Sequence, residues 1–200
     1  MDFRAVVIGR RMCRSFTTEP IVREVLDRVL DAGRRAPAAG NSDGTHLVVL
    51  EGPHETARYW DVTLPPARRA GFRWPHLLDA PVLVVPLADP SAYVDRYSEP
   101  DKAHTGLGAG PAAWPTPYWT VDTAFAAMSI LLAAEDEGLG ALFFGLFEHE
   151  HAVLAALGVP TGLEPIGTIA LGRPRGDDRP GRSAGRPRPS LAEYAHRGGW

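Results

Sequence analysis

Residues 34–51 read Arg-Arg-Ala-Pro-Ala-Ala-Gly-Asn-Ser-Asp-Gly-Thr-His-Leu-Val-Val-Leu-Glu. A helix is expected to end at the start of this stretch, a turn of small residues follows, and a strand begins at His46. Asn41 carries an amide donor and an amide acceptor, which can pair with the imide edge of a heterocycle. Its neighbours Gly40 and Ser42 let a flat polar ligand approach the backbone. An ordinary helix-to-strand connection is the alternative for this stretch taken alone.

The composition predicts one soluble domain over residues 1–200. With 44% hydrophobic and 22% charged residues, the chain has enough material for a core, and it contains no apolar run near the roughly 20 residues that cross a bilayer. The N-terminus lacks a secretory signal, so a cytoplasmic location is expected. A single cysteine, Cys13, excludes an intramolecular disulfide, and a net charge of -3 does not suggest a nucleic-acid binder. Neither nucleic acid nor a membrane is an expected partner.

The arginines gather near the two ends of the chain. Arg10, Arg11 and Arg14 come first, and the four-residue spacing of Arg10 and Arg14 lets both project together near the end of a short first helix. The second group consists of Arg173, Arg175, Arg179, Arg182, Arg186 and Arg188. Guanidinium groups match phosphate oxygens in bidentate geometry, so the first cluster is either an anion site or a solvated basic surface.

Apolar periodicity predicts the regular elements. Helices are expected from Pro20 to Gly33 and over residues 53–62, 65–73, 121–137 and 148–157, and strands over 46–51, 81–87, 141–144 and 165–171. The strand at 81–87 is apolar on both faces, which is typical of the centre of a sheet. Pro86 predicts that this strand ends or lies at an edge there, because proline cannot donate to the ladder.

Three segments carry further expectations. Residues 89–120 lose regular periodicity but hold several aromatic side chains, so an irregular lid or pocket wall is expected. The helix at 121–137 is apolar nearly all round, which predicts burial at the centre or against a second subunit. In the run Glu148-His149-Glu150-His151, adjacent side chains point in different directions on a helix, which favours a charged turn over a metal site.

Four blocks of sequence together resemble the FMN-dependent nitroreductase family. Arg10-Arg-Met-Cys-Arg14 is similar to its opening motif, which implies that Arg10, Arg11 and Arg14 hold the flavin phosphate. Ala36-Pro-Ala-Ala-Gly-Asn41 is similar to the second block, which implies that Pro37, Ala38, Ala39 and Asn41 meet the flavin, the amide at its pyrimidine edge.

The other two blocks lie in the second half of the chain. Residues 138–146 resemble a strand end that passes the reactive face of the flavin, which implies contacts from Phe144, Gly145 and Leu146, the last two through backbone N–H groups. Arg186-Pro-Arg188 resembles the block that returns two more cations to the phosphate.

Two positions depart from the family pattern. Met12 stands where the family usually has a serine, which removes one hydroxyl donor to the phosphate. Asp43-Gly44-Thr45 stands where Gln-Pro-Trp is common. Both departures bear on flavin affinity and pocket shape.

The resemblance implies an α+β fold with a central, mostly antiparallel sheet flanked by helices, in an intertwined homodimer. The implied activity is hydride transfer from NADH or NADPH through FMN to nitroaromatic, quinone or similar flat acceptors, in a ping-pong scheme that needs no catalytic side chain. In the dimer, the tail at 175–200 is expected to wrap over the neighbouring subunit. A flavin-dependent dehydrogenase or oxidase of one metabolite, and a flavin-binding protein without turnover, are the alternatives.

Overall fold

The computed structural model describes residues 2–178, 181 and 184–200, and its centre is an antiparallel sheet. The strands are β1 (Thr45–Glu51), β2 (Val82–Ala88), β3 (Gly140–Phe144), β4 (Glu164–Pro165) and β5 (Thr168–Gly172). They follow the order β1-β2-β5-β3, and the short β4 also pairs with β2. The helices are α1 (Phe3–Gly9), α2 (Arg23–Arg34), α3 (Gly52–Thr63), α4 (Pro66–Arg69), α5 (Pro90–Ser98), α6 (Tyr118–Asp136), α7 (Glu150–Leu157) and α8 (Leu191–Tyr194).

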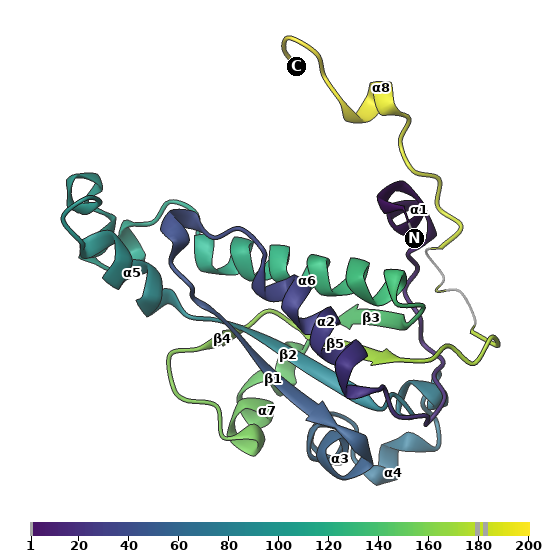
Figure 1. Cartoon of the computed structure of the whole chain (residues 1–200). Coiled ribbons are helices and arrows are strands. Elements are labelled where there is room, and N and C mark those ends of the chain that lie inside the picture. Colours follow the sequence, from purple (N-terminus) through teal and green to yellow (C-terminus); the bar gives the residue numbers. More distant parts are fainter. Residues whose placement is uncertain (1, 179–180, 182–183) are drawn as a thin grey trace.

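The sheet is covered on both faces. Helices α2 and α6 lie against one face, and α3 and α7 lie against the other (Figure 1). In β2, Val82 and Val84 pack towards α2 and α6, whereas Leu83 and Val85 pack towards α3. All four are nearly fully buried, and each contributes about 1.5–3 kcal/mol of hydrophobic stabilisation. This arrangement confirms the predicted α+β fold with an antiparallel sheet flanked by helices, and it explains why β2 is apolar on both faces.

Pro86 does not end β2, and β2 is not an edge strand, so that prediction is wrong. Pro86 pairs with Leu47 of β1, and its carbonyl accepts from the Ile166 N–H on the other side. There the neighbouring chain passes from β4 to β5, and Gly167 has a φ of +150°. Proline lacks an N–H donor, but at Pro86 the neighbouring strand is interrupted between β4 and β5. No regular ladder hydrogen bond from this position is therefore lost.

Helices α2 and α6 pack closely because of one glycine. A β-carbon on Gly33 would lie 2.8 Å from Cγ1 of Ile130. On the other side of α6, Phe125 and Met128 are 48% and 42% exposed. The sequence predicted burial at the centre or against a second subunit, and within this chain α6 is buried along one side and exposed along the other. The structure also starts α2 at Arg23, three residues later than predicted, since Val22 is extended.

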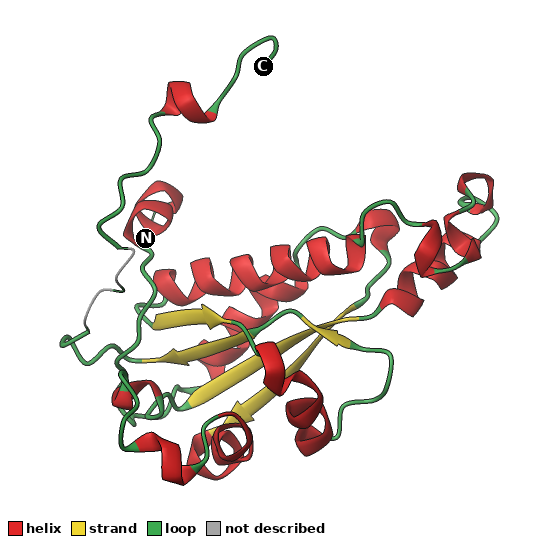
Figure 2. Cartoon of the chain, turned by 180° about the vertical axis from the view of Figure 1, so that it is seen from behind, coloured by secondary structure: helices red, strands yellow, loops and turns green. Residues whose placement is uncertain are grey.

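The prediction of an irregular segment over residues 89–120 is wrong in its first part. Helix α5 begins there because the Asp89 side chain accepts from the Ser91 N–H and Pro90 occupies the first turn. Its Tyr93 is fully buried beside Trp114 and Trp119, and it donates to Asp122 at 2.8 Å. Burial raises the pKa of Tyr93. The aromatic residues therefore form a small core around α5. This helix lies at one end of the molecule (Figures 1 and 2).

The C-terminal segment extends past α1 and away from the sheet (Figures 1 and 2). Leu191 and Tyr194 of α8 are 69% and 76% exposed, although a capping box between Ser190 and Glu193 holds the helix. Contact of this tail with a second subunit stays a prediction. Within the described part of the chain, no helix has the length and apolar character needed to cross a membrane.

Candidate functional site

The segment that carries the first arginines is extended rather than helical. Helix α1 ends at Gly9, and Arg10 has a ψ of 124°. Met12 then forms a parallel bridge with Ala141 of β3, and the Cys13 N–H donates to the Ala141 carbonyl. The four-residue spacing predicted that Arg10 and Arg14 project together from the end of one helix. That prediction is wrong, because both residues follow the end of α1. Pairing with β3 is a long-range interaction that helical periodicity cannot reveal.

The two ends of the chain meet at one basic cavity. Arg10, Arg11, Arg14 and Arg188 line this cavity, whose volume is about 800 Å³. Arg186 is exposed and does not line it, and Arg179 and Arg182 lie outside the described residues. We call this space the basic cavity. It brings together all three predicted N-terminal arginines and one of the two predicted C-terminal ones.

The arginines in the basic cavity differ in how free their donors are. Arg11 Nη1 is within 2.5 to 3.2 Å of the carbonyl oxygens of Ile8, Gly9 and Arg10, so it caps the end of α1. Arg10 Nη1 is buried and has no hydrogen-bond partner. A buried guanidinium N–H without an acceptor is costly, and an anion in the cavity would satisfy it. Arg10 is therefore the stronger candidate for anion binding.

Two carboxylates beside the basic cavity had not been predicted as part of the site. Ser15 Oγ donates to Asp177 Oδ1 at 2.5 Å, and the Arg14 N–H donates to Asp178 Oδ2 at 2.9 Å. The Ser15 hydroxyl and then Arg175 lower the pKa of Asp177. Asp178 lines the basic cavity, and its Oδ1 is buried without a partner. The one signal in the sequence was an acidic pair within an otherwise basic tail.

A second cavity, of about 370 Å³, lies at the end of β3, and we call it the aromatic pocket. Phe144, Gly145 and Leu146 line it, as do Trp60 and Trp74. The rings of Trp60 and Phe144 are parallel with centroids 6.0 Å apart. Neither tryptophan belongs to a motif, and both reach the pocket only through the fold.

Arg14 connects the two cavities. It lines both of them, and its guanidinium carbon lies 5.7 Å from the centre of the Trp74 ring. Such a cation–π contact holds the side chain in place between a basic space and an aromatic one. The geometry therefore suits a ligand with an anionic group at one end and a flat apolar group at the other.

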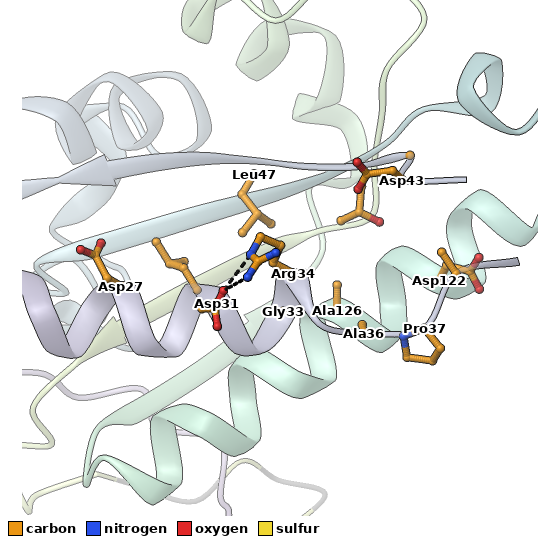
Figure 3. Close-up of a pocket in the computed structure, with 14 residues that line it drawn as sticks. Asp27, Asp31, Gly33, Arg34, Ala36, Pro37, Asp43, Leu47, Asp122 and Ala126 are labelled. Carbon is orange, nitrogen blue, oxygen red and sulfur yellow. Dashed lines mark hydrogen bonds and ion pairs between the residues drawn. The ribbon is translucent and has the colours of Figure 1, made fainter. Parts of the chain in front are cut away.

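The predicted residues of the second block lie elsewhere. Pro37 and Ala38 line a third cavity, of about 380 Å³, beside Asp43 and Asp122 (Figure 3). In the same cavity Arg34 pairs with Asp31, with Nε 2.7 Å from Oδ1. Ala39 and Asn41 line none of these three cavities. Asn41 is exposed and has a φ of +56°, a left-handed conformation that asparagine tolerates better than most residues.

Helix α6 separates this block from the basic cavity. The Ala39 N–H donates to Asp122 near the start of α6, whereas Gly9 packs against Glu135 near its end. A rise of about 1.5 Å per residue separates Asp122 and Glu135 by about 20 Å. Helices α1 and α5 accordingly lie at opposite ends of α6 (Figures 1 and 2). One chain thus holds the predicted flavin residues as two half-sites.

Comparison with known proteins identifies related sequences and structures. The sequence profile described as the nitroreductase family matches residues 7–173. A protein of Thermus thermophilus named NADH dehydrogenase is 27% identical, over 90% of this chain and 90% of its own length. A protein of Staphylococcus epidermidis named NADPH-dependent oxidoreductase is 25% identical, over 89% of this chain and 65% of its own length.

Solved structures share the fold at lower sequence identity. The structure of a nitroreductase-like protein from Streptococcus mutans has a TM-score of 0.76 at 17% identity, with 98% of this chain and 97% of that one covered. A nitroreductase family protein from Clostridium difficile has a TM-score of 0.72 at 20% identity, and both chains are fully covered.

Proposed function

Because this chain belongs to the nitroreductase family, we propose that it is an FMN-dependent oxidoreductase. In this proposal electrons pass from NADH or NADPH to nitroaromatic, quinone or similar flat acceptors. The family and the relatives named for NADH or NADPH make it an oxidoreductase enzyme. The choice of FMN, the class of acceptor and the ping-pong order are our proposal.

The observation that carries the proposal is the position of Arg14 between the basic cavity and the aromatic pocket. FMN has a phosphate at one end and a flat tricyclic ring at the other, and the two cavities offer complementary surroundings. Arg10, Arg14 and Arg188 would hold the phosphate, and the unpartnered Nη1 of Arg10 supports this assignment. Gly145 and Leu146 would meet the ring through backbone N–H groups.

The protein's own part in the reaction is to bind and orient. When bound, FMN supplies the hydride and electron chemistry, so no side chain of this protein is needed as an acid or base. With the ligand bound, the aromatic side chains would limit the access of water to the pocket, and Arg14 would place a positive charge at its border. Nicotinamide and acceptor would use the open side of the same site in turn, which gives ping-pong kinetics.

A second copy of the chain completes the site in this proposal. The turn that holds Asn41 lies at the Asp122 end of α6, and the basic cavity lies near the Glu135 end, about 20 Å along the helix. We therefore infer that one chain does not bring both to the same flavin. The exposed side of α6, with Phe125 and Met128, is an apolar surface that a partner would bury. We therefore propose a homodimer in which Pro37, Ala38, Ala39 and Asn41 of one subunit serve the flavin held by the arginines of the other.

Two measurements test the proposed function. The purified protein should release FMN on denaturation, as identified by chromatography, and FAD or no flavin would contradict the cofactor assignment. Under anaerobic conditions NADH or NADPH should bleach the visible absorbance of the bound flavin, and a quinone should restore it. Bound FMN that neither nicotinamide bleaches would instead favour a dehydrogenase or oxidase of another metabolite, or a protein without turnover.

A further inference from the structure

Phe147 follows directly after the strand end that borders the aromatic pocket, and its conformation is unusual. Its φ is +49°, a left-handed value that a bulky L-residue rarely adopts. Its side chain is 86% exposed, whereas the preceding Leu146 is 5% exposed. The backbone thus turns Leu146 into the core and Phe147 out to solvent, although hydrophobic burial favours the interior for both residues.

The ring of Phe147 has a defined place despite its exposure. It lines the aromatic pocket, and a β-carbon on Gly145 would lie 2.9 Å from its Cζ. Gly145 does not have a positive φ, so a larger side chain at this position would conflict with the backbone less than with the ring, which would have to move aside. The ring therefore rests over Gly145 at the edge of the pocket and leaves most of its surface open to a ligand.

From this geometry we infer that Phe147 is the residue against which the flat electron acceptor stacks. The inference rests on the proposed function, since it takes residues 144–146 as the flavin side of the pocket. An aromatic face attracts other flat π-systems in offset or edge-on arrangements, whereas a saturated ring gains only ordinary apolar contact. Arg14 lines the same pocket, and its guanidinium donors suit the oxygens of a nitro group, a quinone or a carboxylate. Phe147 would thus select acceptors by flatness.

A pair of matched ligands tests the inference without turnover. Benzoate and cyclohexanecarboxylate carry the same charge on six-membered rings, but only benzoate is flat. Calorimetric titration of the purified protein should show tighter binding of benzoate. Phe147→Leu should weaken benzoate binding by about two- to tenfold, which corresponds to the value of one aromatic pair. Binding of cyclohexanecarboxylate should change by less than about twofold.

Two control variants accompany this measurement. Phe147→Tyr keeps the ring and should retain the preference for benzoate. Phe3→Leu changes a ring that is 75% exposed on α1, outside the aromatic pocket, and should leave both affinities unchanged. In steady-state kinetics Phe147→Leu should raise the KM for 1,4-benzoquinone and leave that for ferricyanide, an octahedral complex, unchanged.

Several results would overturn the assignment. A stacking role would be excluded if Phe147→Leu weakened the binding of benzoate and cyclohexanecarboxylate equally, or weakened the binding of neither. It would also be excluded if the wild type bound neither ligand. Conversion of a dimer to a monomer by Phe147→Leu, seen by light scattering, would make the residue an interface contact instead. Absence of nicotinamide oxidation in the wild type, together with a Phe147-dependent preference for benzoate, would refute the proposed function and the acceptor role, and would leave Phe147 only as a contact for flat ligands.

Discussion

Replacing Arg10 by alanine should weaken FMN binding without destabilising the protein that lacks flavin. Its Nη1 is buried without an acceptor, and the residue lines the basic cavity, so we expect the guanidinium to bind an anion there. Loss of one charge-assisted hydrogen bond costs about 1.5–3 kcal/mol of binding free energy. The FMN dissociation constant should therefore rise about 10- to 150-fold.

The effect on stability has the opposite sign. In the flavin-free protein an unsatisfied buried donor costs about 1–3 kcal/mol, and alanine removes this cost. The free energy of unfolding of the flavin-free Arg10→Ala protein should thus be unchanged or higher. Most buried residues that are cut back to alanine behave in the other way, so the sign separates a ligand-binding role from a structural one.

Fluorescence titration of flavin-free protein with FMN, and with riboflavin as a matched ligand, measures the predicted effect. Riboflavin lacks the phosphate, so its affinity should not respond to Arg10→Ala. Arg4→Ala, at an exposed position of α1, is the control for a lost positive charge. Equal weakening of FMN and riboflavin, or lower stability with unchanged FMN affinity, would refute the assignment of Arg10 to the phosphate.

Three further changes test other parts of the structure. Asp178→Asn keeps an acceptor for the Arg14 N–H but removes a negative charge from the basic cavity, so calorimetry should show about fivefold tighter binding of inorganic phosphate; unchanged or weaker binding would argue against a carboxylate facing the anion. Phe125→Asp puts a charge on the exposed side of α6, so light scattering should give the 21.6 kDa of one chain for the variant and twice that mass for the wild type, and the variant should bind FMN more weakly. A dimeric variant with normal FMN affinity would contradict the shared site. A hydrogen bond from Arg28 lowers the pKa of Glu137 from its ordinary value of 4.5, so this ion pair stabilises the fold above pH 4.5 and is lost as the pH falls through the lower pKa of the folded state. The melting temperature of Glu137→Gln should therefore decline less on acidification than that of the wild type, and parallel pH profiles of the two proteins would show that the pair does not cause the decline.

The elements that could be predicted are those whose signal is local. The apolar spacing in α2 and the apolar run in β2 predict a helix and a central strand because burial on one or two faces imposes those patterns directly. Helix α5 was missed although Asp89 and Pro90 form a recognisable start, since the buried aromatic residues that follow carry no clean period. Pro86 misled because its effect depends on which strand lies beside it.

The candidate site shows the same division. The resemblance to the family picked out Arg10 and Arg14, and the structure places both at one cavity, although on an extended segment rather than a helix. It could not reveal that Asp178 enters this cavity, since that depends on pairing between two ends of the chain more than 160 residues apart. Trp60 and Trp74 line the aromatic pocket for a similar reason, because long-range packing rather than any motif brings them there.

The amino-acid sequence by itself determined the family and the layered α+β architecture, and it indicated the residue types of the proposed phosphate and ring contacts, because these depend on short patterns of charge, size and apolar spacing. The tertiary structure decided how those contacts are divided. It joined Arg10, Arg14 and Arg188 at one end of α6 and left Asn41 near the other end. Strand pairing and helix packing set such distances, and they act between residues that are remote in the chain.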